Sequence, residues 1–145
     1  VIFNIIPDRN YTTGEPDQKL ANLQKVIRLT EELNLPLLGG TEMNSPGQKF
    51  VDDFGSPELS PFHPIFLRGS RILHAHSTLQ KYGGMGYLSD WAQNQFPQVV
   101  AKNEFYAEFG DIFSPRGDER LAGSLHSELG AGEVLTLARE SMVSA

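Results

Sequence analysis

The stretch LANLQKVIRLTEELNLPLLGGTEMNSPG, residues 20–47, carries a helical pattern that passes directly into a strand pattern. Between residues 17 and 34, apolar side chains recur every three or four positions, which predicts an amphipathic helix. The helix should end at Asn34-Leu35-Pro36, because proline disfavours a helical residue before it. The apolar run that follows predicts a strand over residues 36–42. Nearly continuous apolar residues predict another strand over residues 1–6, buried on both faces.

A strand, a helix and a strand in this order predict a βαβ unit with parallel strands and a right-handed crossover. Two parallel strands alone leave both sheet edges open, so further strands are needed. The chain also begins inside its first strand. We therefore expect the C-terminal part of a TIM-like barrel, whose other strands come from the remaining N-terminal part of the barrel or from another chain. Residues 1–49 would form this terminal βαβ portion of an α/β fold.

The rest of the chain, residues 50–145, is expected to be a mostly α-helical extension. A short turn or helix is predicted at 50–54. Helical spacing predicts longer helices at residues 70–82, 88–95, 98–109, 118–129 and 133–142. The glycines at 83, 84 and 86 should end the first of these longer helices.

Composition excludes several classes of function. The 145 residues carry a formal net charge of −6 and contain no cysteine. An acidic chain without a basic run is poorly suited to nucleic acid or anionic membranes, and a chain without cysteine has no disulfides or thiolate metal ligands. No apolar run approaches the roughly 18 residues of a membrane span. We expect a cytoplasmic protein that acts on a small-molecule substrate, with no nucleic acid or membrane partner.

The candidate site lies where the predicted strands end, because ligands of βαβ folds bind beyond the carboxyl ends of the strands. Side chains alternate along a strand, so Glu42 and Asn44 would point to the same side while the strand persists. Gly39 and Gly40 remove bulk just before them, which lets a backbone or a ligand approach closely. Glu42 is therefore a candidate metal ligand or general base. The alternative is a structural carboxylate that pairs with an arginine or caps a helix.

The first predicted strand also ends in polar residues. Asp8, Arg9 and Asn10 follow it directly, and Arg9 is a candidate clamp for a phosphate or carboxylate. A surface ion pair of Arg9 with Asp8 or Glu15 is the alternative. Asn4 is a polar residue inside the apolar strand, so it either lines a barrel interior below the site or ties down a neighbouring strand. Asn4, Asp8 and Asn10 are the candidate substrate-binding residues.

Two histidines, His74 and His76, are separated by one residue. On a helix, which the surrounding spacing predicts, they lie about 200° apart and cannot share an ion. We expect His76 to be partly buried, with a ring nitrogen bonded to the backbone or to a polar group. His63 lies near prolines and His126 on a predicted amphipathic helix, so both are expected to be structural or surface residues.

The stretches FNIIPDRN and LANLQKVIRLTEELNLPLLGGTEMNSPG together resemble the end of the polymerase and histidinol phosphatase family. Its members are metal-dependent phosphoesterases on a distorted TIM-like barrel. The last strand of that family typically ends Gly-Ser-Asp-Ala-His, whose Asp and His help to bind the metals. The resemblance places Glu42 on the Asp position and Asn44 on the His position. Asparagine is a poor substitute for imidazole, and the family's N-terminal histidine cluster is absent from this sequence.

The resemblance covers about a third of the chain and implies a metal-dependent hydrolase, with phosphate esters as the expected substrates and a divalent metal ion as cofactor. Glu42 would bind the metal or act as general base, Asn44 would bind metal or substrate, and Arg9 would hold an anion. Two alternatives stay open. One is a sugar or sugar-acid isomerase or lyase on the same barrel, and the other is a non-catalytic binding or assembly module.

Overall fold

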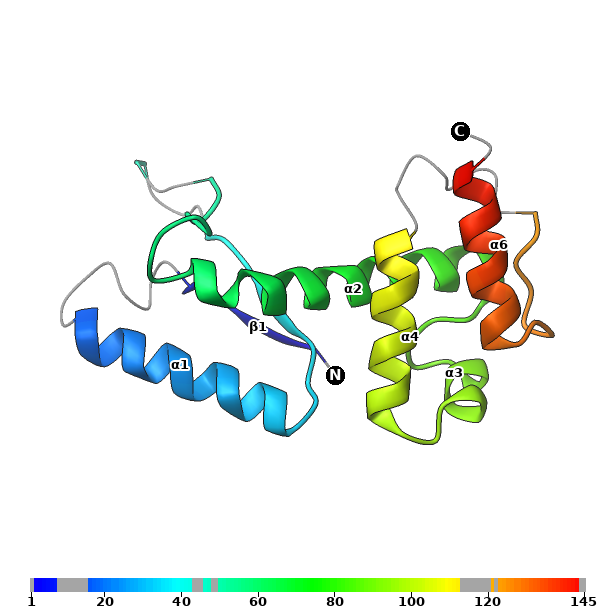
Figure 1. Ribbon diagram of the computed structural model, residues 1–145, viewed down its shortest axis with the longest axis horizontal. Helices are drawn as coiled ribbons and strands as arrows, with labels where there is room; N and C mark the ends of the chain where they lie inside the picture. The colour runs from blue at the N-terminus through cyan, green and yellow to red at the C-terminus, as the bar shows by residue number, and fades with distance from the viewer. Residues whose placement is uncertain are drawn as a thin grey trace. The chain divides into compact units, whose positions relative to one another are not determined.

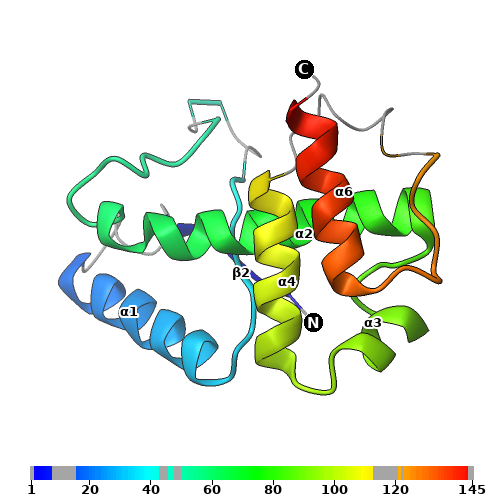
Figure 2. The ribbon, with the colours of Figure 1, turned by 45° about the vertical axis from the view of Figure 1, so that its right-hand side comes forward.

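The structure is a computed structural model that describes residues 2–7, 16–42, 46–47, 50–112, 121 and 123–143. It is an α/β fold in which helices predominate, and it divides into two compact units, Val1–Gly69 and Ser70–Ala145. Figures 1 and 2 show the elements of both units. Residues 50–69 thus belong to the same compact unit as the βαβ portion predicted for residues 1–49.

The first unit contains the predicted βαβ arrangement. Strand β1 (Phe3–Ile5) is followed by helix α1 (Pro16–Glu32) and strand β2 (Leu37–Gly39), and the two strands are parallel. Both strands are shorter than predicted. The Phe3 N–H donates to the Pro36 carbonyl at 2.9 Å, and the Gly40 N–H donates to the Ile5 carbonyl at 2.7 Å. These two bonds mark the ends of the described pairing.

Helix α1 packs into the core through part of the apolar side that the sequence predicts. Leu23 and Ile27 are almost fully buried, and the hydroxyl of buried Thr30 donates to the Ile27 carbonyl at 2.7 Å. Leu33 lies within the predicted helix over residues 17–34 but is 56% exposed. The reason is that α1 ends at Glu32, so Leu33 lies in the turn that follows rather than on the helix.

One face of the sheet packs against helices. Phe3 is paired with Leu37 and Ile5 with Gly39, so these four residues share a face. Leu37 and Ile5 belong to a core that α1 and the start of helix α2 (His63–Gly83) also form, with the members Leu23, Ile27, Leu37, Leu59 and Phe66 and the partly buried Ile5, Leu20, Phe54, Phe62 and Ile65. A Cβ atom on Gly39 would lie 2.9 Å from the Phe54 ring, so this glycine makes room for the aromatic ring.

The opposite face of the sheet carries Asn4, Leu38 and Gly40. Asn4 is exposed, Leu38 is half-buried, and neither belongs to the core of the first unit. Phe3, on the helix-covered face, is still 43% exposed. The expectation that the first strand is buried on both faces is therefore wrong for the residues described, because α1 and α2 supply apolar cover to only one face of the sheet.

Helix α2 begins earlier than the predicted helix over residues 70–82. A short 3₁₀ helix, Ser60–Phe62, leads into it, and Pro64 lies in its first turn, where the missing N–H leaves no hydrogen bond unmade. The helix ends at the predicted glycines, with Gly84 at a φ of +66°.

The second unit is helical. Helices α3 (Asp90–Gln95), α4 (Val99–Ile112) and α6 (Ala131–Val143) confirm three predicted helices. The helix predicted over residues 118–129 is wrong for residues 123–129, which form turns. The Ser124 N–H donates to the Leu121 carbonyl and the Leu129 N–H to the His126 carbonyl, so each bond closes a four-residue turn.

The core of the second unit is rich in aromatic rings. Ile72, Ala75 and Leu79 of α2 are fully buried, and they lie at the helical spacing that predicts a helix over residues 70–82. Trp91 packs against Phe105, with ring centroids 5.5 Å apart, and its indole N–H donates to the Leu129 carbonyl at 2.8 Å.

None of the described helices combines the length and the apolar character that crossing a membrane requires.

Candidate functional site

The candidate site lies at the carboxyl ends of the two strands. Because β1 and β2 are parallel and in register, Ile5 and Gly39 end the strands at the same edge of the sheet. Glu42 follows Gly39 by three positions and is half-buried. The pairing of β2 ends at Gly40, so the alternation of side chains that was expected to align Glu42 with Asn44 does not extend through both residues.

The structure brings Asn4 and Gly40 together across the two strands. A Cβ atom on Gly40 would lie 2.8 Å from Asn4 Oδ1 and 3.0 Å from Nδ2. Gly40 is therefore the residue that makes room for the Asn4 side chain, as close approach at a glycine allows. The Asn4 amide rests on the strand that leads to Glu42 and remains exposed to solvent.

The other candidate residues, Asp8, Arg9, Asn10 and Asn44, lie outside the described residues. Asn4 and Glu42 are thus the two candidates whose positions the structure gives. The described part of the chain contains no group of three His, Cys, Asp or Glu side chains that could hold a metal ion. Glu42 offers carboxylate oxygens and Asn4 an amide oxygen, a donor type that suits Mg²⁺, Mn²⁺ or Ca²⁺ better than Zn²⁺.

One buried carboxylate near this region was missed by the sequence analysis. Asp52 is 6% exposed and lies in the turn that carries Phe54, whose N–H donates to the Asp52 carbonyl at 2.9 Å. The ring of Phe54 packs against Gly39 at the end of β2. The neighbouring Asp53 is exposed and its carboxylate accepts the Gly55 N–H at 3.1 Å. The sequence signal is an Asp-Asp pair directly before a Phe-Gly pair.

The histidines of α2 are arranged as predicted. His74 and His76 lie on one helix, and His76 is half-buried. The Nδ1 atom of His76 accepts the Tyr87 backbone N–H at 2.9 Å, which confirms the expected bond between a ring nitrogen and the backbone. His63 is exposed, with its ring centroid 6.0 Å from that of Phe54. His126 is also exposed but lies between turns rather than on the predicted helix.

A buried polar cluster lies in the second unit. The Tyr87 hydroxyl donates to Asn103 Oδ1 at 2.5 Å, and the Tyr106 hydroxyl donates to the Met85 carbonyl at 2.7 Å. Burial raises the pKa of Tyr106 well above its usual value of about 10, and the neighbouring Tyr87 raises it further. Lys102 Nζ lies 4.6 Å from the centre of the Tyr87 ring. These contacts attach the turn after α2 to α4, so the cluster is structural.

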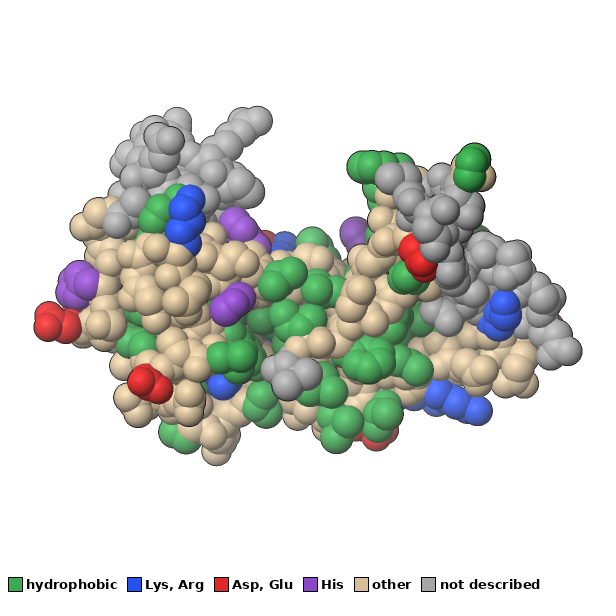
Figure 3. Space-filling model, turned by 180° about the vertical axis from the view of Figure 1, so that it is seen from behind, with side chains coloured by type: hydrophobic (Ala, Val, Ile, Leu, Met, Phe, Trp, Pro, Cys, Tyr) green, Lys and Arg blue, Asp and Glu red, His purple; other side chains and the backbone are tan. Residues whose placement is uncertain are grey.

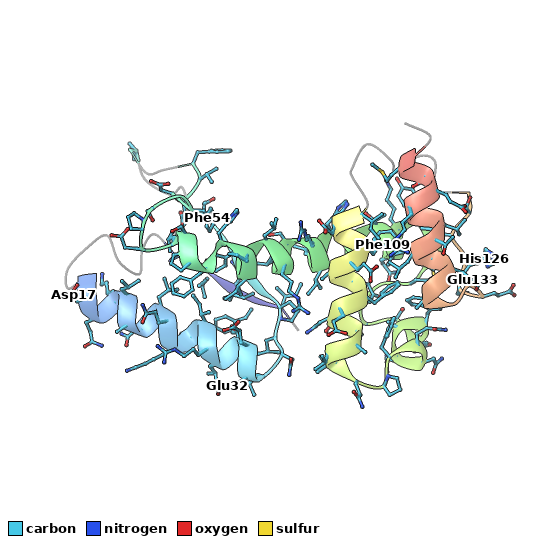
Figure 4. All side chains as sticks on the ribbon, viewed as in Figure 1. Asp17, Glu32, Phe54, Phe109, His126 and Glu133 are labelled. Atoms are coloured by element: carbon cyan, nitrogen blue, oxygen red, sulfur yellow. The ribbon has the colours of Figure 1, made fainter. Side chains whose placement is uncertain are left out.

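A shallow open depression is lined by residues of α6 and of the segment before it, namely Leu129, Gly132, Glu133, Thr136 and Leu137. Its one carboxylate, Glu133, accepts the Gly130 N–H at 2.7 Å and so caps the start of α6 (Figure 4). This carboxylate therefore has a structural role.

Comparison of the chain with models of known protein families, with curated proteins and with solved structures finds no match.

Proposed function

We propose that the chain is the C-terminal portion of a metal-dependent hydrolase of phosphate esters, built on a TIM-like barrel. The supporting observation is that the described helices cover only one face of the parallel sheet. Helices pack on the face of Leu37 and Ile5, whereas the face of Asn4 and Gly40 carries no described helix. Open doubly wound sheets carry helices on both faces, while a barrel carries them only outside. Asn4 and Gly40 would then face the barrel interior, just below the edge that leads to Glu42.

Glu42 is the residue proposed to bind a divalent cation or to act as general base. Its carboxylate is half-buried at the edge where the strands end. A bound cation would polarise a phosphoryl oxygen and lower the pKa of a bound water. Asn44 would hydrogen-bond the substrate or bind the metal, and Arg9 would hold the anionic group of the substrate. Asn4, Asp8 and Asn10 would contact the substrate.

The test is the variant Glu42→Gln, with Glu31→Gln as a matched control. Glu31 is an exposed carboxylate of α1, so both substitutions remove one negative charge and preserve side-chain shape. The intact protein is loaded in turn with Mg²⁺, Mn²⁺ and Zn²⁺, and bound metal is measured after dialysis. Hydrolysis of p-nitrophenyl phosphate is measured on the same samples.

We expect Glu42→Gln to lose the bound metal and at least about 100-fold in rate, as for removal of a general base, while Glu31→Gln keeps both. The free energy of unfolding should change by less than about 1 kcal/mol in either variant, since neither side chain is buried. If the wild-type protein binds none of the metals, or if Glu42→Gln retains metal and activity, the proposal is wrong. A loss of stability that accompanies the loss of activity would instead support a structural carboxylate.

A further inference from the structure

The turn over residues 84–87 follows α2 and lies against a histidine of that helix. The Tyr87 N–H donates to His76 Nδ1 at 2.9 Å. A Cβ atom on Gly86 would lie 2.9 Å from the same ring nitrogen, which is closer than a side chain larger than hydrogen allows. The backbone of the turn and the imidazole ring are therefore in direct contact, with no space between them.

The bond between Tyr87 and His76 defines the protonation state of the histidine. A backbone N–H only donates, so His76 Nδ1 accepts and carries no proton. The proton of the neutral ring is then on Nε2, and a second proton would have to bind Nδ1. Two N–H groups cannot face each other across 2.9 Å. The bond therefore exists only while His76 is neutral.

The same turn is attached to helix α4 at two further points. The Met85 side chain is fully buried, and the Met85 carbonyl accepts the Tyr106 hydroxyl at 2.7 Å. The Tyr87 hydroxyl donates to Asn103 Oδ1 at 2.5 Å. Because Tyr106 and Asn103 both belong to α4, a displacement of the turn away from His76 would disturb the packing of α4 as well.

The surroundings of His76 let solvent protons reach the ring. His76 is half-buried, and in the part of the chain that the structure describes it bonds to the Tyr87 N–H and forms no ion pair with a carboxylate. Gln80, one turn further along α2, is uncharged. From α4, Lys102 lies 4.6 Å from the centre of the Tyr87 ring, and Tyr106 bonds to the turn. Lysine and tyrosine ordinarily keep their charge between pH 5 and 8, so histidine is the residue type that responds in this range.

From these contacts we infer that His76 makes the second unit sensitive to mild acid: a proton bound at Nδ1 breaks the bond to Tyr87 and releases the turn over residues 84–87. The unfolded chain has no such bond to lose, so it takes up the proton more readily than the folded chain. The stabilisation is therefore present above the ordinary titration range of imidazole, near pH 6.5, and is lost as the pH falls below it. This inference does not depend on the proposed hydrolase activity.

The first test is NMR of the intact wild-type protein with ¹⁵N-labelled histidine and backbone amides. At pH 8 we expect His76 Nδ1 at the chemical shift of an unprotonated nitrogen and Nε2 at that of an N–H group. Between pH 8 and pH 5, the Tyr87 amide should lose about tenfold or more of its protection from hydrogen exchange, after correction for the intrinsic rates. A proton on Nδ1 at pH 8, or equal protection of Tyr87 at both pH values, would overturn the inference.

The second test separates His76 from the other titrating groups. The chain contains four histidines, and histidine side chains are visible on the surface that Figure 3 shows. His76→Asn keeps an acceptor oxygen close to the Nδ1 position but does not titrate. His126→Asn is the matched control, because His126 is an exposed histidine of the same unit. Urea unfolding is followed by the fluorescence of Trp91, the one tryptophan of the chain, which belongs to the second core.

We expect the urea midpoint of the wild type and of His126→Asn to fall by about 0.5–1 M more between pH 8 and pH 5 than that of His76→Asn. An equal fall in all three proteins would show that His76 does not carry the response. A response that disappears in His126→Asn and persists in His76→Asn would contradict the inference as well. If His76→Asn does not fold, the exchange of the Tyr87 amide in the wild type decides.

Discussion

The substitution Gly69→Ala tests the closest packing contact of the first unit. The added methyl group would lie 1.9 Å from the Leu37 carbonyl oxygen, whereas carbon and oxygen atoms in a close contact normally stay about 3.3 Å apart. Both partners are backbone, so no side-chain rotation relieves the overlap, and α2 must move away from β2. Such overpacking costs roughly 1–3 kcal/mol, here at the upper end. Alanine returns about 1 kcal/mol of helix propensity, which leaves a net loss of about 2 kcal/mol.

The assay is urea unfolding followed by far-UV circular dichroism, with Gly132→Ala as the matched control. Gly132 lies in α6, and a Cβ atom there would meet no atom within 4 Å. The same substitution should therefore stabilise the protein by up to about 1 kcal/mol at Gly132 and destabilise it at Gly69. If Gly69→Ala is as stable as the wild type while Gly132→Ala gains stability, the backbone of α2 does not lie against Leu37 of β2, and the packing argument is refuted.

Three further predictions concern the second unit. His76→Ala should destabilise the protein by roughly 1–3 kcal/mol in urea unfolding, because the Tyr87 N–H loses its acceptor, and His76→Asn should recover part of this loss. Trp91→Phe should cost about 1 kcal/mol, since the indole bond to the Leu129 carbonyl disappears, and a cost near zero would show that this bond adds nothing. Burial raises the pKa of Tyr106, so the unfolded chain ionises this phenol first. The associated stability is present below about pH 10 and falls as the pH rises further, and Tyr106→Phe should reduce the slope of the urea midpoint between about pH 9 and 11.

The elements that the sequence predicts correctly are those whose signal is local. The spacing of Leu23 and Ile27 specifies α1 and its buried stripe, and the spacing of Ile72, Ala75 and Leu79 does the same for α2. The parallel pairing also follows from local order, because a helix between two short strands leaves them parallel. The ends of the elements were less accurate, since a proline such as Pro64 can stop one helix or begin another.

The sequence alone does not determine which apolar residues of the strands are buried. Phe3 and Leu37 are both large apolar residues of short strands and are paired in the sheet, yet Phe3 is exposed and Leu37 is buried. The difference arises because α2 reaches Leu37 through Gly69, a contact between residues that lie far apart in the sequence. Apolar patterning gives the tendency of a residue to be covered, but the covering element is set by tertiary packing.

The glycines and the asparagine of the candidate site illustrate the same limit at single residues. In the sequence alone, the space that Gly39-Gly40 clears and the polar Asn4 within an apolar strand are two unrelated features. Once the register pairs Ile5 with Gly39, they become one feature, because the Asn4 amide occupies the space above Gly40 and the Phe54 ring occupies the space above Gly39 on the opposite face. A side chain larger than hydrogen at position 40 would displace the Asn4 amide. The two glycines are therefore explained by side chains of this chain on both faces of the sheet, and a ligand at this edge would have to contact Asn4 and Glu42 rather than enter the space beside the glycines.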